Sequence, residues 1–212
     1  MNIGSKKQLE IVLSKVLGFY EAKVREEQYI TPSSIAAEVL WKAYFNGDIE
    51  KKTIADFGAG TGVLGIGCLL LGAKNVFFVE RDAEAMRICQ INVAKVKSEY
   101  SGLGEPLFAL SDLRNFEIKV DTIITNPPFG TKVRHADKEF LLKAFTAADK
   151  VYSFHKSSTS EFVVELAKKN CFILDEKFNF SFMLKNTMKH HMKNKPHIEV
   201  SCFVLTRHSH SQ

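Results

Sequence analysis

The chain has 212 residues, of which 45% are hydrophobic and 25% are charged, and this composition is typical of a single folded domain with a substantial core. Its formal net charge of +5 suits a polyanionic partner without requiring one, because scattered lysines solvate most protein surfaces. No apolar run approaches the roughly 20 residues of a membrane span, and the N-terminus lacks a signal-peptide core. We therefore expect a cytoplasmic protein, or a nuclear one in a eukaryote, with no membrane partner. The cysteines show no Cys-x-x-Cys spacing, which disfavours zinc and disulfides, and we expect all four to be reduced and buried: Cys68, Cys89, Cys171 and Cys202.

Helical and strand-like segments alternate along most of the chain. The first helix is expected over residues 5–18, and a second begins at 31–32 with Thr31 as its N-cap. Short β-branched or aromatic runs follow at 53–57, 75–80, 106–111, 120–125 and 151–154, with helical segments at 60–71, 83–98, 137–149 and 158–169. Two more strands, at 172–184 and 198–206, have no helix between them.

This alternation predicts an α/β fold, in which a mostly parallel sheet carries helices on both faces and ends in an antiparallel pair. We expect one domain over residues 1–212, with a helical cap at 1–50 and the catalytic core at 51–212.

The sequence DFGAGTGVLG follows the first expected strand. Val63 occupies the third glycine position of the dinucleotide fingerprint G-x-G-x-x-G, so that fingerprint fails. The pattern D-x-G-x-G-x-G is satisfied by Asp56, Gly58, Gly60 and Gly62. A carboxylate at the end of this strand would repel a pyrophosphate but attract an amino group and a sulfonium. S-adenosylmethionine is such a ligand; the alternative is a glycine-rich turn with no ligand.

Acidic residues end the next two strands. Glu80 lies twenty residues after Gly60 and can accept hydrogen bonds from both ribose hydroxyls of a nucleoside. Asp82 is better explained as the N-cap of the following helix. Asp112, just after the third strand, could meet the cofactor's adenine amino group, although a turn residue is nearly as common at such a place.

The tetrapeptide Asn126-Pro127-Pro128-Phe129 directly follows an apolar strand. The prolines fix the backbone and remove two donors, so that the turn presents acceptors. The Asn126 side-chain oxygen and the Pro127 carbonyl could together grip the hydrogens of a planar amine such as the 6-amino group of adenine. Phe129 offers a face for stacking the base, a contact worth about 1–3 kcal/mol in nucleic-acid complexes. The alternative is a rigid turn followed by a core phenylalanine.

The segments DFGAGTGVLGIG, VDTIITNPPFG and FHKSST together resemble the class I S-adenosylmethionine-dependent amino methyltransferases. More narrowly, the chain resembles, nearly end to end, the archaeal and eukaryotic adenine-N6 methyltransferases of small-subunit ribosomal RNA. The resemblance implies a seven-stranded Rossmann-like sheet and methylation of an adenosine in RNA. The N-P-P-F motif is shared with DNA adenine and protein glutamine methyltransferases, which remain alternatives, as does a catalytically idle scaffold in an RNA-processing complex. The implied cofactor-binding set is Gln28, Tyr29, Thr31, Asp56, Gly58, Gly60, Gly62, Val63, Glu80, Asp112 and Asn126.

The resemblance also implies a partner, the small zinc-binding activator protein that pairs with several RNA methyltransferases. In this fold the run 106–111 would lie at the sheet edge, where Leu107, Phe108 and Leu110 invite strand addition or cover by another chain.

Basic residues are candidates for RNA contact in two places. In FHKSST we expect His155 and Lys156 to contact the substrate and one of the serines at 157–158 to cap the next helix. The acid-free segment 185–197 carries Lys189, Lys193 and Lys195, for which phosphate is the expected ligand; the alternative is a solvated surface loop. Its adjacent histidines at 190–191 lack cysteine or carboxylate neighbours, so we expect no metal site.

Overall fold

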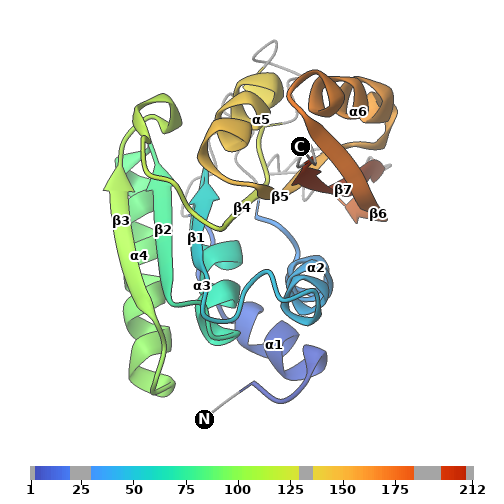
Figure 1. Ribbon diagram of the computed structural model, residues 1–212. Helices are drawn as coiled ribbons and strands as arrows, with labels where there is room; N and C mark the ends of the chain where they lie inside the picture. The colour runs from blue at the N-terminus through green and yellow to red at the C-terminus, as the bar shows by residue number, and fades with distance from the viewer. Residues whose placement is uncertain (1–2, 20–29, 129–135, 184–196, 209–212) are drawn as a thin grey trace, which may run out of the picture.

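The protein folds into a seven-stranded sheet with helices on both faces (Figure 1). The computed structural model describes residues 3–19, 30–128, 136–183 and 197–208. The strand order is β3-β2-β1-β4-β5-β7-β6, and only the pairs β5–β7 and β7–β6 among these are antiparallel. The predicted fold class is therefore confirmed. The strands are β1 (Thr53–Phe57), β2 (Asn75–Glu80), β3 (Glu105–Leu110), β4 (Thr122–Thr125), β5 (Lys150–Lys156), β6 (Phe172–Met183) and β7 (His197–Arg207).

The helices form two layers because each buries an apolar face against one side of the sheet. One core cluster includes Leu40, Ile66 and Val93 and joins α1, α2, α3 and α4 to one face. A second cluster includes Leu141 and Leu166 and joins α5 and α6 to the other face. The helices are α1 (Lys6–Leu13), α2 (Ser33–Phe45), α3 (Val63–Leu70), α4 (Ala83–Glu99), α5 (Ala136–Ala147) and α6 (Ser160–Lys169), with 3-10 turns η2 (Leu113–Asn115) and η3 (Ser157–Thr159).

The N-terminal helices differ from the prediction at their boundaries. Helix α1 is capped by the Ser5 hydroxyl, which accepts the Gln8 N–H, but it ends at Leu13 rather than near Gly18. Residues 14–19 instead run as turn and irregular chain toward the sheet. Thr31 is not the N-cap of α2, because Pro32 occupies that position and makes no side-chain capping bond. The Thr31 side chain is thereby available for another role.

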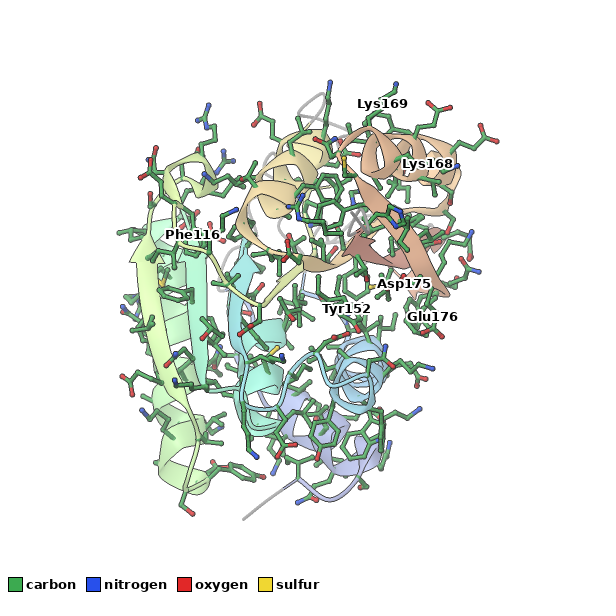
Figure 2. The ribbon with its side chains drawn as sticks, in the orientation of Figure 1. Phe116, Tyr152, Lys168, Lys169, Asp175 and Glu176 are labelled. Atoms are coloured by element: carbon green, nitrogen blue, oxygen red, sulfur yellow. The ribbon has the colours of Figure 1, made fainter. Side chains whose placement is uncertain are left out.

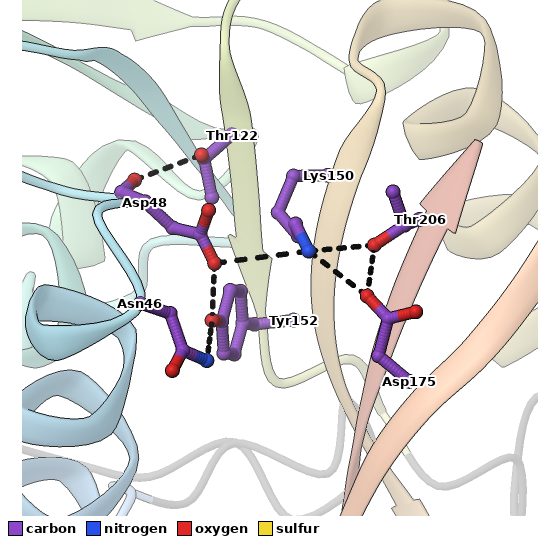
Figure 3. Close-up of polar contacts among 7 residues, drawn as sticks. All are labelled: Asn46, Asp48, Thr122, Lys150, Tyr152, Asp175 and Thr206. Carbon is purple, nitrogen blue, oxygen red and sulfur yellow. Dashed lines mark hydrogen bonds and ion pairs between the residues drawn. The ribbon is translucent and has the colours of Figure 1, made fainter. Parts of the chain in front are cut away.

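A polar network joins the chain after α2 to the far half of the sheet (Figure 3). The Tyr152 hydroxyl donates to the Asp48 carboxylate over 2.6 Å and accepts from the Asn46 amide over 3.2 Å. Burial and the neighbouring Asp48 raise the pKa of Tyr152. Lys150 extends the network to Asp175 on β6 at 2.9 Å. These residues lie near the amino ends of β4 and β5, so they anchor the N-terminal helices at the edge opposite the carboxyl ends of the parallel strands.

The cysteines are buried as expected, with one exception. Cys68, Cys89 and Cys202 are buried and free, as expected, whereas Cys171 is free but exposed in the turn before β6. Figure 2 shows Lys168 and Lys169 on the outer side of α6.

Within the described ranges no helix is long and apolar enough to cross a membrane.

Candidate functional site

A cavity of about 170 Å³ opens at the carboxyl ends of β1, β2 and β4. Strand order reverses between β1 and β4, and ligands of open α/β sheets bind at such a switch point. Nine of the predicted site residues line the cavity: Thr31, Asp56, Gly58, Gly60, Val63, Glu80, Asp112, Asn126 and Pro128. The sequence motifs therefore converge on one place.

The glycine turn between β1 and α3 requires glycine for conformational and steric reasons. Gly58, Gly60 and Gly62 all have positive φ, at +67°, +54° and +91°. A Cβ on Gly62 would lie 2.6 Å from the Cys89 sulfur, so this glycine lets the turn pack on α4 and does not itself line the cavity. The N–H of Gly58 donates to the Val79 carbonyl over 2.9 Å, which fixes the turn against the end of β2.

Asp56 lies beneath this turn, and only 1% of its surface is exposed. One of its carboxylate oxygens accepts the N–H of Gly65, in the first turn of α3, over 2.9 Å. Burial raises the pKa of Asp56 to about 7; the Gly65 hydrogen bond opposes the shift, and the charge of Glu80 adds to it. A cationic ligand group next to Asp56 would favour the ionised carboxylate.

Glu80 is held by backbone groups of two loops. Its Oε2 accepts the Gly60 N–H over 2.9 Å, and its Oε1 accepts the N–H groups of Arg81 and Asp82 over 2.8 and 2.9 Å. The carboxylate thus joins the glycine turn to the end of β2 with its orientation fixed. Asp82 caps α4 as predicted, accepting from the N–H groups of Glu84 and Ala85.

Asp112 has the turn role considered for it and also lines the cavity, whereas its contact with the adenine amino group stays a prediction. Its carboxylate caps η2 and accepts two hydrogen bonds from the Arg114 guanidinium, each of 2.9 Å. The hydrogen bonds from Arg114 lower the pKa of Asp112. Because Asp112 also lines the cavity, this ion pair forms part of the cavity wall.

Asn126 presents an acceptor with no partner. Its Nδ2 donates to the Thr31 hydroxyl oxygen over 2.9 Å, which orients the amide, while Oδ1 is buried and has no hydrogen-bond partner among the described residues. Buried polar atoms without a partner are rare in proteins, and each calls for an explanation. The neighbouring Thr125 hydroxyl donates to the Phe57 carbonyl over 2.8 Å, so the start of the Asn-Pro-Pro turn is tied to the strand that leads into the glycine turn.

Two cavity-lining phenylalanines have no sequence signal. A Cβ on Gly58 would lie 2.9 Å from Phe140 of α5, and one on Gly60 would lie 3.1 Å from Phe19. Both rings therefore contact the glycine turn, although one follows α1 and the other lies on α5. Neither phenylalanine belongs to a local sequence motif. The only sequence clue is the glycines themselves, because a glycine can mark a place where another side chain packs closely on the backbone.

The prediction for FHKSST is corrected by the structure. Its first three residues continue β5, where His155 pairs with Ser201 of β7. The imidazole is only 1% exposed because it lies between the Phe203 ring of β7 and Asp137 of α5, whose carboxylate is 3.8 Å from Nδ1. Its Nε2 lies 2.7 Å from the Ser153 hydroxyl, and burial lowers its pKa. A phosphate contact by this ring is therefore wrong, whereas Lys156 is partly exposed at the strand end. The expected serine cap is also wrong, because Thr159 precedes α6 and makes no side-chain capping bond.

Several predicted residues lie outside the described part of the chain. They are Gln28, Tyr29, Phe129, Lys189, Lys193 and Lys195. Pro127 is described and buried, but it does not line the cavity. Within the described part of the chain, no group of three or more histidine, cysteine, aspartate or glutamate side chains could hold a metal ion.

Comparison with known proteins identifies the family. The family model of the methyltransferase small domain matches residues 34–192. The chain belongs to this family. The methyltransferase is 33% identical to the Danio rerio protein named rRNA N(6)-adenosine-methyltransferase METTL5, over 94% of this chain and 98% of that one. It is 32% identical to the Drosophila melanogaster protein of the same name, over 92% of each chain.

Solved structures agree with this assignment. A Pyrococcus horikoshii protein, PH1948, described as a proposed RNA methyltransferase, is 39% identical to this chain. The two superpose with a TM-score of 0.86 over 99% of this methyltransferase and 100% of that chain. The resemblance inferred from the three sequence segments is confirmed.

Proposed function

We propose that this methyltransferase transfers a methyl group from S-adenosylmethionine to the 6-amino group of an adenosine in RNA, most specifically in small-subunit ribosomal RNA. The observation that carries the proposal is the buried Oδ1 of Asn126 beside the cavity, an acceptor without a partner in the described part of the chain. The names of the relatives from Danio rerio and Drosophila melanogaster support an adenosine of ribosomal RNA as the substrate.

The arrangement of the cavity fits the cofactor at both of its ends. The fixed carboxylate of Glu80 would accept hydrogen bonds from the ribose hydroxyls, and Asp112 lies on the same wall, where the adenine amino group would be met. Asp56, beneath the glycine turn, would face the amino group. When bound, the cofactor supplies an electrophilic methyl group on a sulfonium.

The chain's contribution to the chemistry is to position and polarise the amine. The amine lone pair of adenine is delocalised into the ring, and a hydrogen bond from the amine to Asn126 Oδ1 would shift electron density back toward nitrogen. Thr31 would keep Oδ1 aimed at the amine by accepting from Nδ2. In the transfer the nitrogen–methyl bond would form as the sulfur–methyl bond breaks, and the sulfur would leave as the thioether of S-adenosylhomocysteine. The amine becomes acidic only as the methyl arrives, so it would lose its extra proton to solvent after transfer and no strong general base is required.

The substrate adenine must leave its stack to reach Asn126, which costs a few kcal/mol and least at an unpaired position. Lys156, at the end of β5, and the basic segment at 185–197 are the proposed phosphate contacts.

Methyl transfer from labelled S-adenosylmethionine to separate RNA, DNA and protein fractions tests the proposed substrate class. Digestion of the labelled RNA should give N6-methyladenosine. Label in DNA or in glutamine of protein, with none in RNA, would replace the proposed substrate. No label in any fraction, from a folded preparation that binds S-adenosylmethionine, would favour an idle scaffold.

We also propose a small zinc-binding activator protein as a partner, on the exposed edge of the sheet. Strand β3 lies at that edge, where Phe108 and Leu110 are 38% and 57% exposed. Such an edge can accept an additional strand from another chain. Aspartate in place of Leu110 should weaken a co-purified heterodimer, whereas the same change at Ile91, 42% exposed on α4, should not. A purified methyltransferase that stays monodisperse and fully active alone would contradict an obligate partner.

A further inference from the structure

A buried asparagine on α4 links the glycine turn to the chain that follows α1. Asn92 is only 1% exposed, so its amide is a polar group inside the core. Its Oδ1 accepts the Leu17 N–H over 2.8 Å, and its Nδ2 donates to the Leu17 carbonyl over 3.0 Å. The same Nδ2 donates to the Thr61 carbonyl, inside the glycine turn, over 2.9 Å. One side chain therefore fixes two segments that are far apart in sequence.

The two segments held by Asn92 form facing parts of the cavity. Phe19, two residues after Leu17, lines the cavity, and its ring end would lie 3.1 Å from a Cβ on Gly60. Thr61 follows Gly60 directly and lines the cavity as well. The Leu17 side chain is 49% exposed, so its own packing does little to fix this segment, and both of its backbone polar groups depend on Asn92.

We propose that Asn92 is a positioning residue for cofactor binding, because it holds Phe19 against the glycine turn as one wall of the cofactor cavity. The amide satisfies one backbone donor and two backbone acceptors. Without it, Leu17 and its neighbours exchange their fixed hydrogen bonds for water, and Phe19 loses its place beside Gly60. The inference rests on the proposed cofactor site and adds a determinant from outside the sequence motifs.

A double-mutant cycle on S-adenosylhomocysteine affinity tests the proposal. Phe19→Ala should raise Kd about five- to twentyfold, the scale of a lost aromatic contact, and Asn92→Ala should raise it by a similar factor. Because both changes remove the same wall, the double variant should bind no more than about twofold weaker than Phe19→Ala alone. Phe19→Leu should restore most of the affinity.

The remaining measurements separate positioning from loss of stability. Val93→Ala removes buried apolar volume from the next position of α4, and we expect its Kd to stay within about twofold of the unmodified chain. For Asn92→Ala, KM for the cofactor should rise, while kcat at saturating cofactor should stay within about twofold. If Asn92→Ala does not fold, amide exchange of residues 14–19 in the unmodified chain should still slow when S-adenosylhomocysteine binds.

Three results would overturn the proposal: a folded Asn92→Ala variant with normal Kd, a double variant whose Kd rises by the product of the two single effects, or amide exchange of residues 14–19 that does not slow when S-adenosylhomocysteine binds. Glu80→Ala distinguishes this failure from failure of the cofactor site itself. A normal Kd in Glu80→Ala would refute the site, whereas a weakened Kd there beside a normal Kd in Asn92→Ala refutes only the positioning role.

Discussion

The buried carboxylate of Asp56 should make cofactor binding depend on pH near neutrality. Its pKa of about 7 without ligand follows from burial, which outweighs the Gly65 hydrogen bond, with the charge of Glu80 added. With that pKa, about nine-tenths of Asp56 is ionised at pH 8 and about one-tenth at pH 6. If the bound amino group requires the ionised form, affinity should fall about tenfold between pH 8 and pH 6, because binding must then release a proton.

Calorimetry of S-adenosylmethionine binding in buffers of different ionisation enthalpy measures both the affinity and the proton release. The Asp56→Asn variant is the matched control: it keeps the size of the side chain, and any pH dependence left in it belongs to the ligand. We expect weak binding in this variant at every pH and no added proton release near pH 6.5. Equal affinity of the unmodified chain at pH 6 and pH 8, with no proton release, would refute the proposed contact between Asp56 and the amino group.

Three other substitutions test separate parts of the molecule. Thr31→Val should lower kcat about five- to tenfold, because it removes the hydrogen bond that orients Asn126, while the cofactor Kd stays within about threefold although Thr31 lines the cavity. Thr31→Ser should restore the rate, and equal kcat in Thr31→Val would show that the bond is dispensable. Tyr152→Phe should lower the free energy of unfolding, measured in urea, by about 1–2 kcal/mol, because Asp48 loses a hydrogen-bond donor, while kcat stays normal. Unchanged stability would contradict the anchoring role of the network in Figure 3. Neutralising Lys189, Lys193 and Lys195 to glutamine should flatten the dependence of log RNA affinity on log salt by about 2–3 and leave cofactor binding intact, whereas an unchanged slope would place the RNA elsewhere.

Local patterns in the sequence predicted the sheet, the glycine turn and the acids that end its strands. Asp56 and Glu80 could be placed because strand ends of a parallel sheet meet at one edge, and positive φ at Gly58 and Gly60 agrees with the motif. Asp82 was predictable as a helix cap because its bonds are to residues two and three positions away.

Contacts between distant residues were not predictable in this way. The hydroxyl of Thr31 suits an N-cap equally well, and its bond to Asn126 spans 95 positions of the chain. The contacts between Asn92 and Leu17 span 75 positions. From the sequence His155 resembles a surface residue of a loop, but in the fold Phe203 of β7 and Asp137 of α5 lie against its ring and bury it. Each of these features depends on a partner that local sequence does not reveal.

We assign Asn126 to the substrate amine and not to the cofactor, although the resemblance also places it in the cofactor-binding set. The direct measurement compares Asn126→Ala with Glu80→Ala for S-adenosylhomocysteine affinity and for methyl transfer to adenosine in RNA. Asn126→Ala should lose about two orders of magnitude or more in transfer, the scale for removing a group that stabilises a transition state, with Kd within about threefold of the unmodified chain. Glu80→Ala should weaken binding by about 1.5–3 kcal/mol, because the ribose loses hydrogen bonds to a charged acceptor. Near-normal methyl transfer by Asn126→Ala, or a loss of cofactor affinity as large as that of Glu80→Ala, would contradict the assigned role.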